Sequence, residues 1–392
     1  MNHSYLIGID IGTSACKVAL FDRSGCVLAA ANGDYPVYYP KEGWAEQNPE
    51  EWWSAVCGAV RQVIEEASVA PEEIAGVGID GQSWSAIAID RNGHVLTNTP
   101  IWMDTRAQSV CDRLNEEIGA EAIFEVAGNS LQPSYTTAKI LWYKENLPEV
   151  YAKTDKILQS NSFIAFKLTG AVSQDLSQGY GLHCFDMRTG KWNEAMCEKL
   201  GIPVEFLPEI VPCDHVVGTV TKKAAEECGL AEGTPVVAGG LDAACGTLGA
   251  GVINPGETQE QGGQAGGMSI CLDEYKADPR LILGFHVVPG KWLLQGGTTG
   301  GGGVMRWFER EPILSSNTSK GLLSENIFCH TFLTADPCVF YILYFSENYY
   351  FFIESGKFPT STTDIFLTYS TVQTRIRFVL PGIPSGTPPA NT

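Results

Sequence analysis

Asp10 ends an apolar stretch of the chain, and the residues after it could hold phosphate. Residues 5–12 read YLIGIDIG, and Gly12, Thr13 and Ser14 form the turn that follows. A tight turn of this kind presents backbone amides and hydroxyls to phosphate oxygens. Because magnesium prefers carboxylate oxygens, water and nucleotide phosphates, Asp10 could orient that metal. A hairpin turn in which Asp10 only caps the loop explains the same residues equally well.

Asp242 lies between two glycines and a run of small residues that could begin a helix. The glycines are at 239–240 and the small residues at 243–246. A carboxylate at a strand end, beside a helix amino terminus, is placed to take a proton from a hydroxyl nucleophile. An ordinary N-cap aspartate is the commoner local explanation. The glycine clusters at 262–267 and 296–303 could line a nucleotide cleft, although neither matches the GxxxxGK[ST] or GxGxxG loop.

A third group of residues is of the kind that binds a polyol. It consists of Gln82, Ser83, Trp84, Asp104 and Arg106. An aromatic ring covers the apolar face of a sugar, while carboxylate and guanidinium groups bond to its hydroxyls. The alternative places Trp84 in the core and makes Asp104 and Arg106 a surface ion pair.

The elements that must position these residues alternate between strand and helix. Residues 5–30 predict three strands, separated by turns at 12–14 and 23–25. Further patterns predict a strand at 74–80, a hairpin about 91–93 and helices near 107–118, 137–146 and 193–200. Strands and helices that alternate after an opening meander indicate an α/β domain with a mixed sheet.

The helix that begins near Asn48 has the clearest start signal. Asn48 is a favourable N-cap, Pro49 suits the first turn, and Glu51 stands where it would close a capping box. The apolar residues of this helix, Trp52, Val56, Val60 and Val63, follow at helical spacing. We therefore expect one buried face.

Length, charge and cysteine spacing exclude several classes of protein. A chain of 392 residues argues for two or three domains. The net charge of −19 repels a nucleic acid backbone, so no nucleic acid partner is expected. Without a secretion signal or a long apolar run, we expect a cytoplasmic protein that does not enter the membrane. The 12 cysteines stand singly and predict reduced, mostly buried thiols rather than zinc ligands or disulfides.

Seven segments together resemble the sugar kinases of the FGGY carbohydrate kinase family, and most of all its kinases of xylulose and ribulose. The segments are GIDIGTSACKVALFD (8–22), GWAEQNPEEWW (43–53), GIDGQSW (78–84), IWMDTRA (101–107), YTTAKILW (135–142), GGLDAACGTLGAG (239–251) and GGTTGGGGVMRWF (296–308). They occur in family order and span residues 4–310. One GIDIGT hairpin alone is also found in actin-like chaperones, hexokinases and acetate kinases, so the ordered set carries the resemblance.

The resemblance implies a fold and a reaction. The fold is two actin-like (ribonuclease H-like) ATPase domains with a cleft between them. The reaction is phosphorylation of a ketopentose or related polyol at a terminal hydroxyl, with Mg²⁺ and ATP as cofactors. Family members are often dimers, so a homodimer is implied as well.

The resemblance also implies roles for individual residues. Asp242 would be the catalytic base and Asp10 the metal ligand, while Gln82, Trp84 and Asp104 would contact the sugar. The implied ATP contacts are Thr13, Ser14, Gly263, Gln264, Thr298, Gly302 and Arg306. One departure is the sequence GQAG at 263–266, where many relatives have Gly-Thr-Ser-Gly.

The chain changes character after about residue 310. Its last 82 residues hold 14 of the 40 aromatic residues but only 4 of the 42 glycines. We expect an N-terminal kinase domain at 1–245, the start of a C-terminal ATP-side domain at 246–310 and a divergent aromatic tail at 311–392. The strand, glycine turn and strand expected at 259–271 echo the Asp10 hairpin and suggest two similarly built domains.

The loss of family motifs near residue 311 suggests a truncated or frame-shifted reading frame. An incomplete second domain would expose aromatic surface and favour aggregation. The alternatives are therefore an inactive truncated kinase or a non-catalytic actin-like protein that binds nucleotide or sugar. A chaperone-type ATPase fits less well, because it would not need the polyol-binding group.

Overall fold

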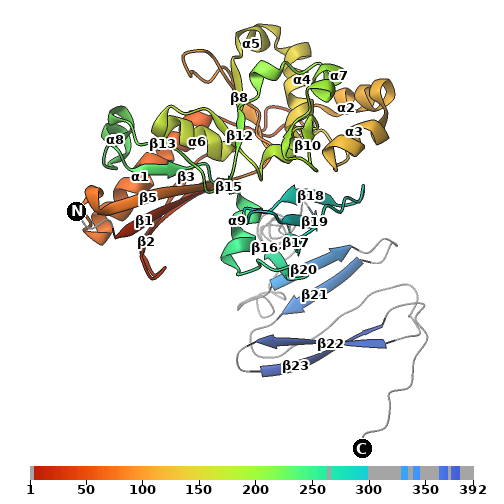
Figure 1. The fold of residues 1–392 in the computed structure, drawn as a ribbon. Coiled ribbons are helices and arrows are strands. Elements are labelled where there is room, and N and C mark those ends of the chain that lie inside the picture. Colours follow the sequence, from red (N-terminus) through yellow and green to blue (C-terminus); the bar gives the residue numbers. More distant parts are fainter. Residues whose placement is uncertain are drawn as a thin grey trace, which may run out of the picture. The chain divides into compact units, whose positions relative to one another are not determined.

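The computed structural model describes residues 4–262 and 266–298, together with four strands further along the chain (Figure 1). The chain divides into two compact units. The first unit comprises Met1–Gln261 and Gly267–Thr299, and the second comprises Gly262–Gly266 and Gly300–Thr392. All the predicted site residues that the structure describes belong to the first unit.

The first unit is built on a seven-stranded mixed sheet. Strands β1, β2 and β3 form an antiparallel meander, as predicted, and β5 pairs with β1 in parallel. The strand order is β13-β14-β5-β1-β2-β3, with β15 also paired to β5. The strands are β1 (Tyr5–Ile11), β2 (Ala15–Asp22), β3 (Val27–Asp34), β5 (Ile74–Gly81), β13 (Val216–Thr219), β14 (Pro235–Val237) and β15 (Gly240–Leu241). The mixed α/β sheet expected from the sequence is confirmed.

Helix α1 (Pro49–Ala67) covers one face of this sheet and begins as predicted at the Asn48 N-cap. The side chain of Asn48 accepts a hydrogen bond from the amide of Glu50 at 3.0 Å. The capping box is wrong, because Glu51 accepts from the Tyr38 hydroxyl at 2.8 Å instead of turning back to the N-cap. The predicted apolar face is confirmed, since Trp52, Val56, Val60 and Val63 are all fully buried.

The other predicted helices are confirmed with small shifts of boundary. The helix expected near 107–118 comprises α2 and a π-helical turn, Asn115–Gly119. The helices of the first unit beyond α1 are α2 (Gln108–Leu114), α3 (Ala120–Ala127), α4 (Thr136–Asn146), α5 (Pro148–Lys153), α6 (Ser160–Thr169), α7 (Glu194–Leu200), α8 (Lys222–Cys228) and α9 (Asp242–Gly249). Helices α1, α6 and α8 pack on one another, and α1 and α6 also pack on the seven-stranded sheet.

Short strand pairs connect these helices. The hairpin predicted about residues 91–93 is confirmed by the bond from the Gly93 amide to the Asp90 carbonyl, 2.9 Å long, and by the bridge between Ile89 and Val95. The short strands are β4 (Glu46–Gln47), β6 (Ile87–Ile89), β7 (Thr99–Pro100), β8 (Lys156–Leu158), β9 (Ser173–Asp175), β10 (Phe185–Asp186), β11 (Lys191–Trp192) and β12 (Glu209–Val211). Single 3-10 turns occur at Pro71–Glu73, Gly179–Gly181 and Val204–Phe206.

A second, four-stranded sheet follows α9 and has the order β16-β17-β19-β18. Its strands are β16 (Thr258–Gly262), β17 (Gly266–Leu272), β18 (Ile282–Phe285) and β19 (Trp292–Thr298). The predicted strand, turn and strand at 259–271 are confirmed, although the turn residues 263–265 lie outside the described part of the chain.

Two antiparallel hairpins are described beyond residue 298. They pair β20 (Phe328–Leu333) with β21 (Val339–Tyr344), and β22 (Thr362–Tyr369) with β23 (Val372–Val379). The rest of the predicted aromatic tail at 311–392 lies outside the described residues. The domain boundaries at 245 and 310, and the truncation near 311, therefore stay predictions.

The cysteines follow the sequence-based expectation. The ten cysteines whose side chains the structure describes are free thiols, and most of them are buried. Within the same part of the chain, no helix combines the length and the apolar character needed to cross a membrane.

Candidate active site

Three carboxylates gather where strands β1, β5 and β15 end. Asp10 and Asp80 are register partners in the parallel β1–β5 pair. Gly240 pairs with Asp80 in the β15–β5 ladder, two residues before Asp242. The two predicted functional aspartates are thus brought together, and Asp80 joins them. Asp80 was missed, although the repeated tripeptide GID at 8–10 and 78–80 was a signal that two strands end alike.

The like charges of these carboxylates perturb their titration. Burial raises the pKa of Asp80 well above its usual range, and repulsion from Asp10 and Asp242 adds to the effect. Burial raises the pKa of Asp242 to about 7, with a smaller contribution from the charge on Asp10. Lys17 opposes both increases in pKa and bonds to Asp10 at 2.8 Å. One ammonium thus faces three acidic groups.

Asp242 is the first residue of helix α9 rather than its N-cap. The N-cap is Leu241, so the explanation of Asp242 as an ordinary N-cap is wrong. The Oδ1 atom of Asp242 accepts from the amide of Ala243 at 2.6 Å. That bond lowers the pKa of Asp242 and partly opposes the effect of burial. The helix predicted from the small residues after Asp242 is confirmed.

A divalent cation beside Asp10, Asp80 and Asp242 would be shared between protein carboxylates and other ligands, rather than enclosed by protein ligands alone. Among the described residues, no three Asp, Glu, His or Cys side chains are spaced to enclose a metal ion. Magnesium usually takes only one or two carboxylates and completes its shell with water and substrate phosphates. The excess of negative charge around Asp10 suits such an ion. The assignment of Asp10 as metal ligand stays a prediction.

The turn after β1 is held rigidly by side chains from elsewhere in the first unit. The Tyr35 hydroxyl donates to the Gly12 carbonyl at 2.7 Å, and the Gln47 amide donates to the Thr13 carbonyl at 2.9 Å. The Trp102 indole donates to the Thr13 hydroxyl at 3.0 Å. Ser14 is exposed. These bonds hold the turn in place, and the assignment of Thr13 and Ser14 as phosphate contacts stays a prediction.

The other predicted nucleotide contacts are only partly within the described chain. Thr298 is the last residue of β19. Gly263, Gln264, Gly302 and Arg306 lie outside the described residues, and their roles stay predictions.

Gln82, Ser83 and Trp84 follow β5 directly and lie beside the acidic group. Gln82 is buried and donates to the Gln47 side chain at 2.9 Å, while its Oε1 has no donor among the described residues. Trp84 has a left-handed backbone, with φ of 60°. Its ring stacks on Tyr135 with centroids 4.2 Å apart and planes 24° apart. Trp84 is half-buried, so it can both pack against the core and offer an aromatic surface.

Tyr180 connects the stacked rings of Trp84 and Tyr135 with the carboxylates of Asp10, Asp80 and Asp242. Its ring meets Trp84 edge-on at 5.8 Å. Burial raises the pKa of the Tyr180 hydroxyl well above its usual range, and negative charge at Tyr135 and Asp242 raises it further. A hydrogen bond with Ser83 acts in the opposite direction. The sequence carried no signal for Tyr180, because it comes from a turn about a hundred residues away from Trp84 in the chain.

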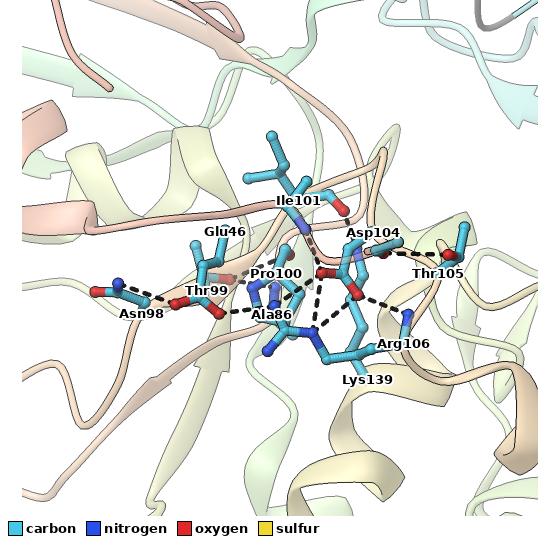
Figure 2. Close-up of polar contacts among 12 residues, drawn as sticks. Glu46, Ala86, Asn98, Thr99, Pro100, Ile101, Asp104, Thr105, Arg106 and Lys139 are labelled. Carbon is cyan, nitrogen blue, oxygen red and sulfur yellow. Dashed lines mark hydrogen bonds and ion pairs between the residues drawn. The ribbon is translucent and has the colours of Figure 1, made fainter. Parts of the chain in front are cut away.

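Asp104 and Arg106 form a buried ion pair, shown in Figure 2. Their side chains are 0% and 3% exposed, so the surface position considered for this pair is wrong. The Asp104 carboxylate accepts from the Ala45 amide at 2.7 Å and from the Arg106 side chain at 2.9 Å. Arg106 also bonds to Glu46 at 2.7 Å and stacks over Trp44 at 3.9 Å. A direct sugar contact of Asp104 stays a prediction.

A buried carboxylate, Asp175, ties the end of β5 to the start of α9. Its Oδ1 accepts from the Ser177 hydroxyl at 2.6 Å and from the Gln178 amide at 2.9 Å. The Ser177 hydroxyl accepts from the Leu241 amide at 2.9 Å, and the Gln178 side chain donates to the Gly81 carbonyl at 3.0 Å. These bonds fix Leu241, which precedes Asp242, relative to Gly81, which precedes Gln82. Sequence reasoning missed this link.

The mixed α/β architecture of the first unit is the actin-like ATPase fold of the sugar kinases. The structure superposes on the crystal structure of xylulose kinase from Rhodospirillum rubrum with a TM-score of 0.75 and 27% identity, covering 81% of this chain and 64% of that one. Residues 5–249 match the family model described as the FGGY family of carbohydrate kinases, N-terminal domain. The chain therefore belongs to the FGGY family of carbohydrate kinases, which confirms the resemblance and the fold class.

Curated relatives agree with this assignment. The chain is 32% identical over 308 residues to xylulose kinase of Bacillus subtilis (strain 168), covering 78% of this chain and 62% of the relative. It is 30% identical over 327 residues to xylulose kinase of Lactococcus lactis subsp. lactis (strain IL1403), covering 82% and 64%. The matched region thus spans slightly less than two thirds of the length of these relatives.

Proposed function

We propose that the protein transfers the terminal phosphoryl group of Mg-ATP to a terminal hydroxyl of an open-chain ketopentose or related polyol, as a xylulose kinase does. One observation carries the proposal. Asp242 begins helix α9 and has its pKa raised to about 7, next to a turn suited to phosphate and an aromatic and amide group suited to a sugar. The xylulose kinases among its relatives support ketopentoses as the substrates to test first.

In this proposal Asp242 is the general base. A base works best when its pKa lies near the working pH, and about 7 meets that condition. The amide of Ala243 fixes the carboxylate through Oδ1. The other oxygen, Oδ2, would take the proton as the sugar oxygen attacks phosphorus.

The phosphate side of the site is assigned to the turn after β1. The backbone amides there, with the hydroxyls of Thr13 and Ser14, would bond to phosphoryl oxygens. A magnesium ion beside Asp10 would neutralise charge that develops on those oxygens. Lys17 holds the Asp10 carboxylate in place at 2.8 Å. Gly263, Gln264, Thr298, Gly302 and Arg306 would contribute the remaining nucleotide contacts.

The sugar side of the site is assigned to Gln82, Ser83 and Trp84, with Asp104 and Arg106 behind them. The buried Oε1 of Gln82, which lacks a donor among the described residues, suits a sugar hydroxyl. The Trp84 ring suits the apolar face of an extended ketose. Which ketopentose fits best depends on the configuration of single hydroxyls.

The test is ADP release by the full chain with Mg-ATP and D-xylulose, L-xylulose, D-ribulose or L-ribulose, against an Asp242→Ala control. Release that requires a ketose and falls by about 10²-fold or more in the control supports the proposal. Release without ketose would indicate an ATPase instead. Ketose binding without any release would indicate a non-catalytic sugar-binding protein.

A further inference from the structure

A buried lysine on helix α4, Lys139, joins the two segments that carry the predicted sugar contacts. Its Nζ donates to the carbonyl of Trp84 at 2.8 Å and to the carbonyl of Ile101 at 2.8 Å. Figure 2 shows Lys139 beneath the loop that runs from Ile101 to Arg106. Trp84 and Ile101 are separated by a hairpin in the sequence, and this ammonium bonds to both of their carbonyls.

The side chain of Lys139 is 0% exposed, and this burial decides what it can do. It cannot touch a substrate that enters from solvent, so it is not a catalytic residue. Lysine is almost never fully buried unless it is paired. Within the part of the chain that the structure describes, no carboxylate lies within ion-pair distance of Nζ. Burial accordingly lowers the pKa of Lys139 to about 7, with Asp104 acting in the opposite direction.

A buried amine bonded to two carbonyls, without an ion-pair partner in the described residues, is a costly arrangement. Its two acceptors are informative. Trp84 holds a left-handed backbone at φ 60°, a conformation that a bulky residue keeps only when its surroundings fix it. The bond from Lys139 reaches the carbonyl of that same residue. The Trp84 ring is fixed as well, because it stacks on Tyr135, which immediately precedes α4.

The second acceptor of Lys139, the Ile101 carbonyl, belongs to a turn that also includes Asp104. The Ile101 carbonyl also accepts from the Asp104 amide at 3.0 Å, which closes the turn that contains Trp102. Trp102 donates in turn to the Thr13 hydroxyl at 3.0 Å. Lys139 thus supports a turn that contacts the turn after β1 on one side and buries the Asp104 carboxylate on the other.

We propose that Lys139 is a positioning residue for the sugar site, which sets the Trp84 backbone and the Ile101–Arg106 turn at the spacing that a ketose needs. This inference rests on the proposed function. It predicts that losing the Nζ bonds weakens sugar binding selectively, because the two segments are then free to shift relative to each other. Nucleotide binding should change little, because Trp102 reaches the turn after β1 only at the Thr13 hydroxyl, and that turn keeps its bonds from Tyr35 and Gln47.

The test compares Lys139→Met with Lys144→Met in the full chain. Both lysines lie on α4, and both donate to a backbone carbonyl, but Lys144 is exposed and bonds to Gly201 at 3.5 Å. Titration calorimetry with the four ketopentoses and, separately, with Mg-ATP gives the two affinities. Each variant is measured well below its own unfolding temperature, with the folded fraction checked by circular dichroism.

We expect Lys139→Met to raise the ketose Kd by about tenfold or more, with the Mg-ATP Kd within about twofold of the unsubstituted chain. Lys144→Met should leave both constants unchanged. Lys139→Arg, which keeps a cationic donor, should recover part of the ketose affinity. A purely architectural role would lower the unfolding temperature and leave both affinities of the folded protein unchanged, and that result would overturn the inference.

Three further outcomes are decisive. If neither variant at position 139 folds while Lys144→Met does, the role is architectural and the inference is rejected. If the unsubstituted chain binds no ketopentose, the proposed function fails and this inference fails with it. Equal ketose binding by Lys139→Met and the unsubstituted chain would reject the inference alone.

Discussion

Asp10 and Asp80 are register partners on adjacent parallel strands, so two acidic side chains stand next to each other where these strands end. Burial raises the pKa of Asp80 well above its usual range, and the negative charges of Asp10 and Asp242 raise it further. A cation bound beside Asp80 would balance this charge and favour the ionised form of its carboxyl group.

The first prediction concerns the stability of an Asp80→Asn variant. The folded-state pKa of Asp80 is raised, so the folded chain binds more protons than the unfolded chain between the two pKa values. Between those values the unsubstituted chain therefore loses about 1.4 kcal/mol of stability for each pH unit above about 4. Asp80→Asn lacks this loss. The difference between its free energy of unfolding and that of the unsubstituted chain should therefore grow in favour of the variant from pH 4 upwards and then level off. Urea unfolding between pH 4 and pH 8 measures it, and a difference in stability that stays constant over this pH range would contradict it.

The second prediction concerns the pH dependence of turnover. Because the pKa of Asp242 is about 7, kcat/KM should fall about tenfold per pH unit below that value, as the base becomes protonated. Steady-state rates with saturating Mg-ATP, measured from pH 5.5 to 8.5, give the profile. A flat profile down to pH 5.5 would show that Asp242 is not the titrating base.

The third prediction concerns Lys17, whose charge lowers the pKa of Asp242. Without that charge the Asp242 carboxylate holds its proton to a higher pH, so Lys17→Met should move the acidic limb of the kcat/KM profile to higher pH. The same pH series of steady-state rates measures the change. Lys222→Met, on the exposed start of α8, is the matched control and should leave the profile unchanged. A limb that moves to lower pH would contradict the charge argument.

The fourth prediction concerns Asp175. An amide in its place would turn an N–H toward donors of Asn161 and Gln174, which bond to Oδ2 at 2.9 and 3.2 Å. We expect Asp175→Asn to destabilise the fold by about 1–3 kcal/mol, as measured by urea unfolding. Asp186→Asn is the control, because the Asp186 side chain accepts from the exposed backbone amides of Arg188 and Thr189. Equal loss in both variants would rule out a special role for Asp175.

Much of the fold follows from local patterns in the sequence. The meander at residues 5–30, the N-cap at Asn48 and the helix after Asp242 depend on neighbours within a few residues. Patterns of that range are visible in one sequence. The capping box failed because the partner of Glu51 is Tyr38, a residue outside the helix.

The site was less predictable from the sequence, because its contacts join residues that lie far apart in the chain. Asp80 joins the acidic group only through its register with Asp10, and a strand pattern does not state which strands are neighbours. Burial of Arg106 depends on Trp44 and Trp142, which stack on its guanidinium from other segments. Lys139 looked like an ordinary helix residue, since nothing nearby in the sequence indicates that its amine meets two distant carbonyls.

The β1–β5 strand ladder, which carries Asp10 and Asp80, also fixes the spacing between their two carboxyl groups. Neighbouring strands lie about 4.8 Å apart, a spacing set by backbone hydrogen bonds rather than by loops. The two carboxyl groups therefore behave as parts of one rigid body. A change of conformation elsewhere in the chain would leave the spacing of this pair unchanged as long as the β1–β5 ladder is intact.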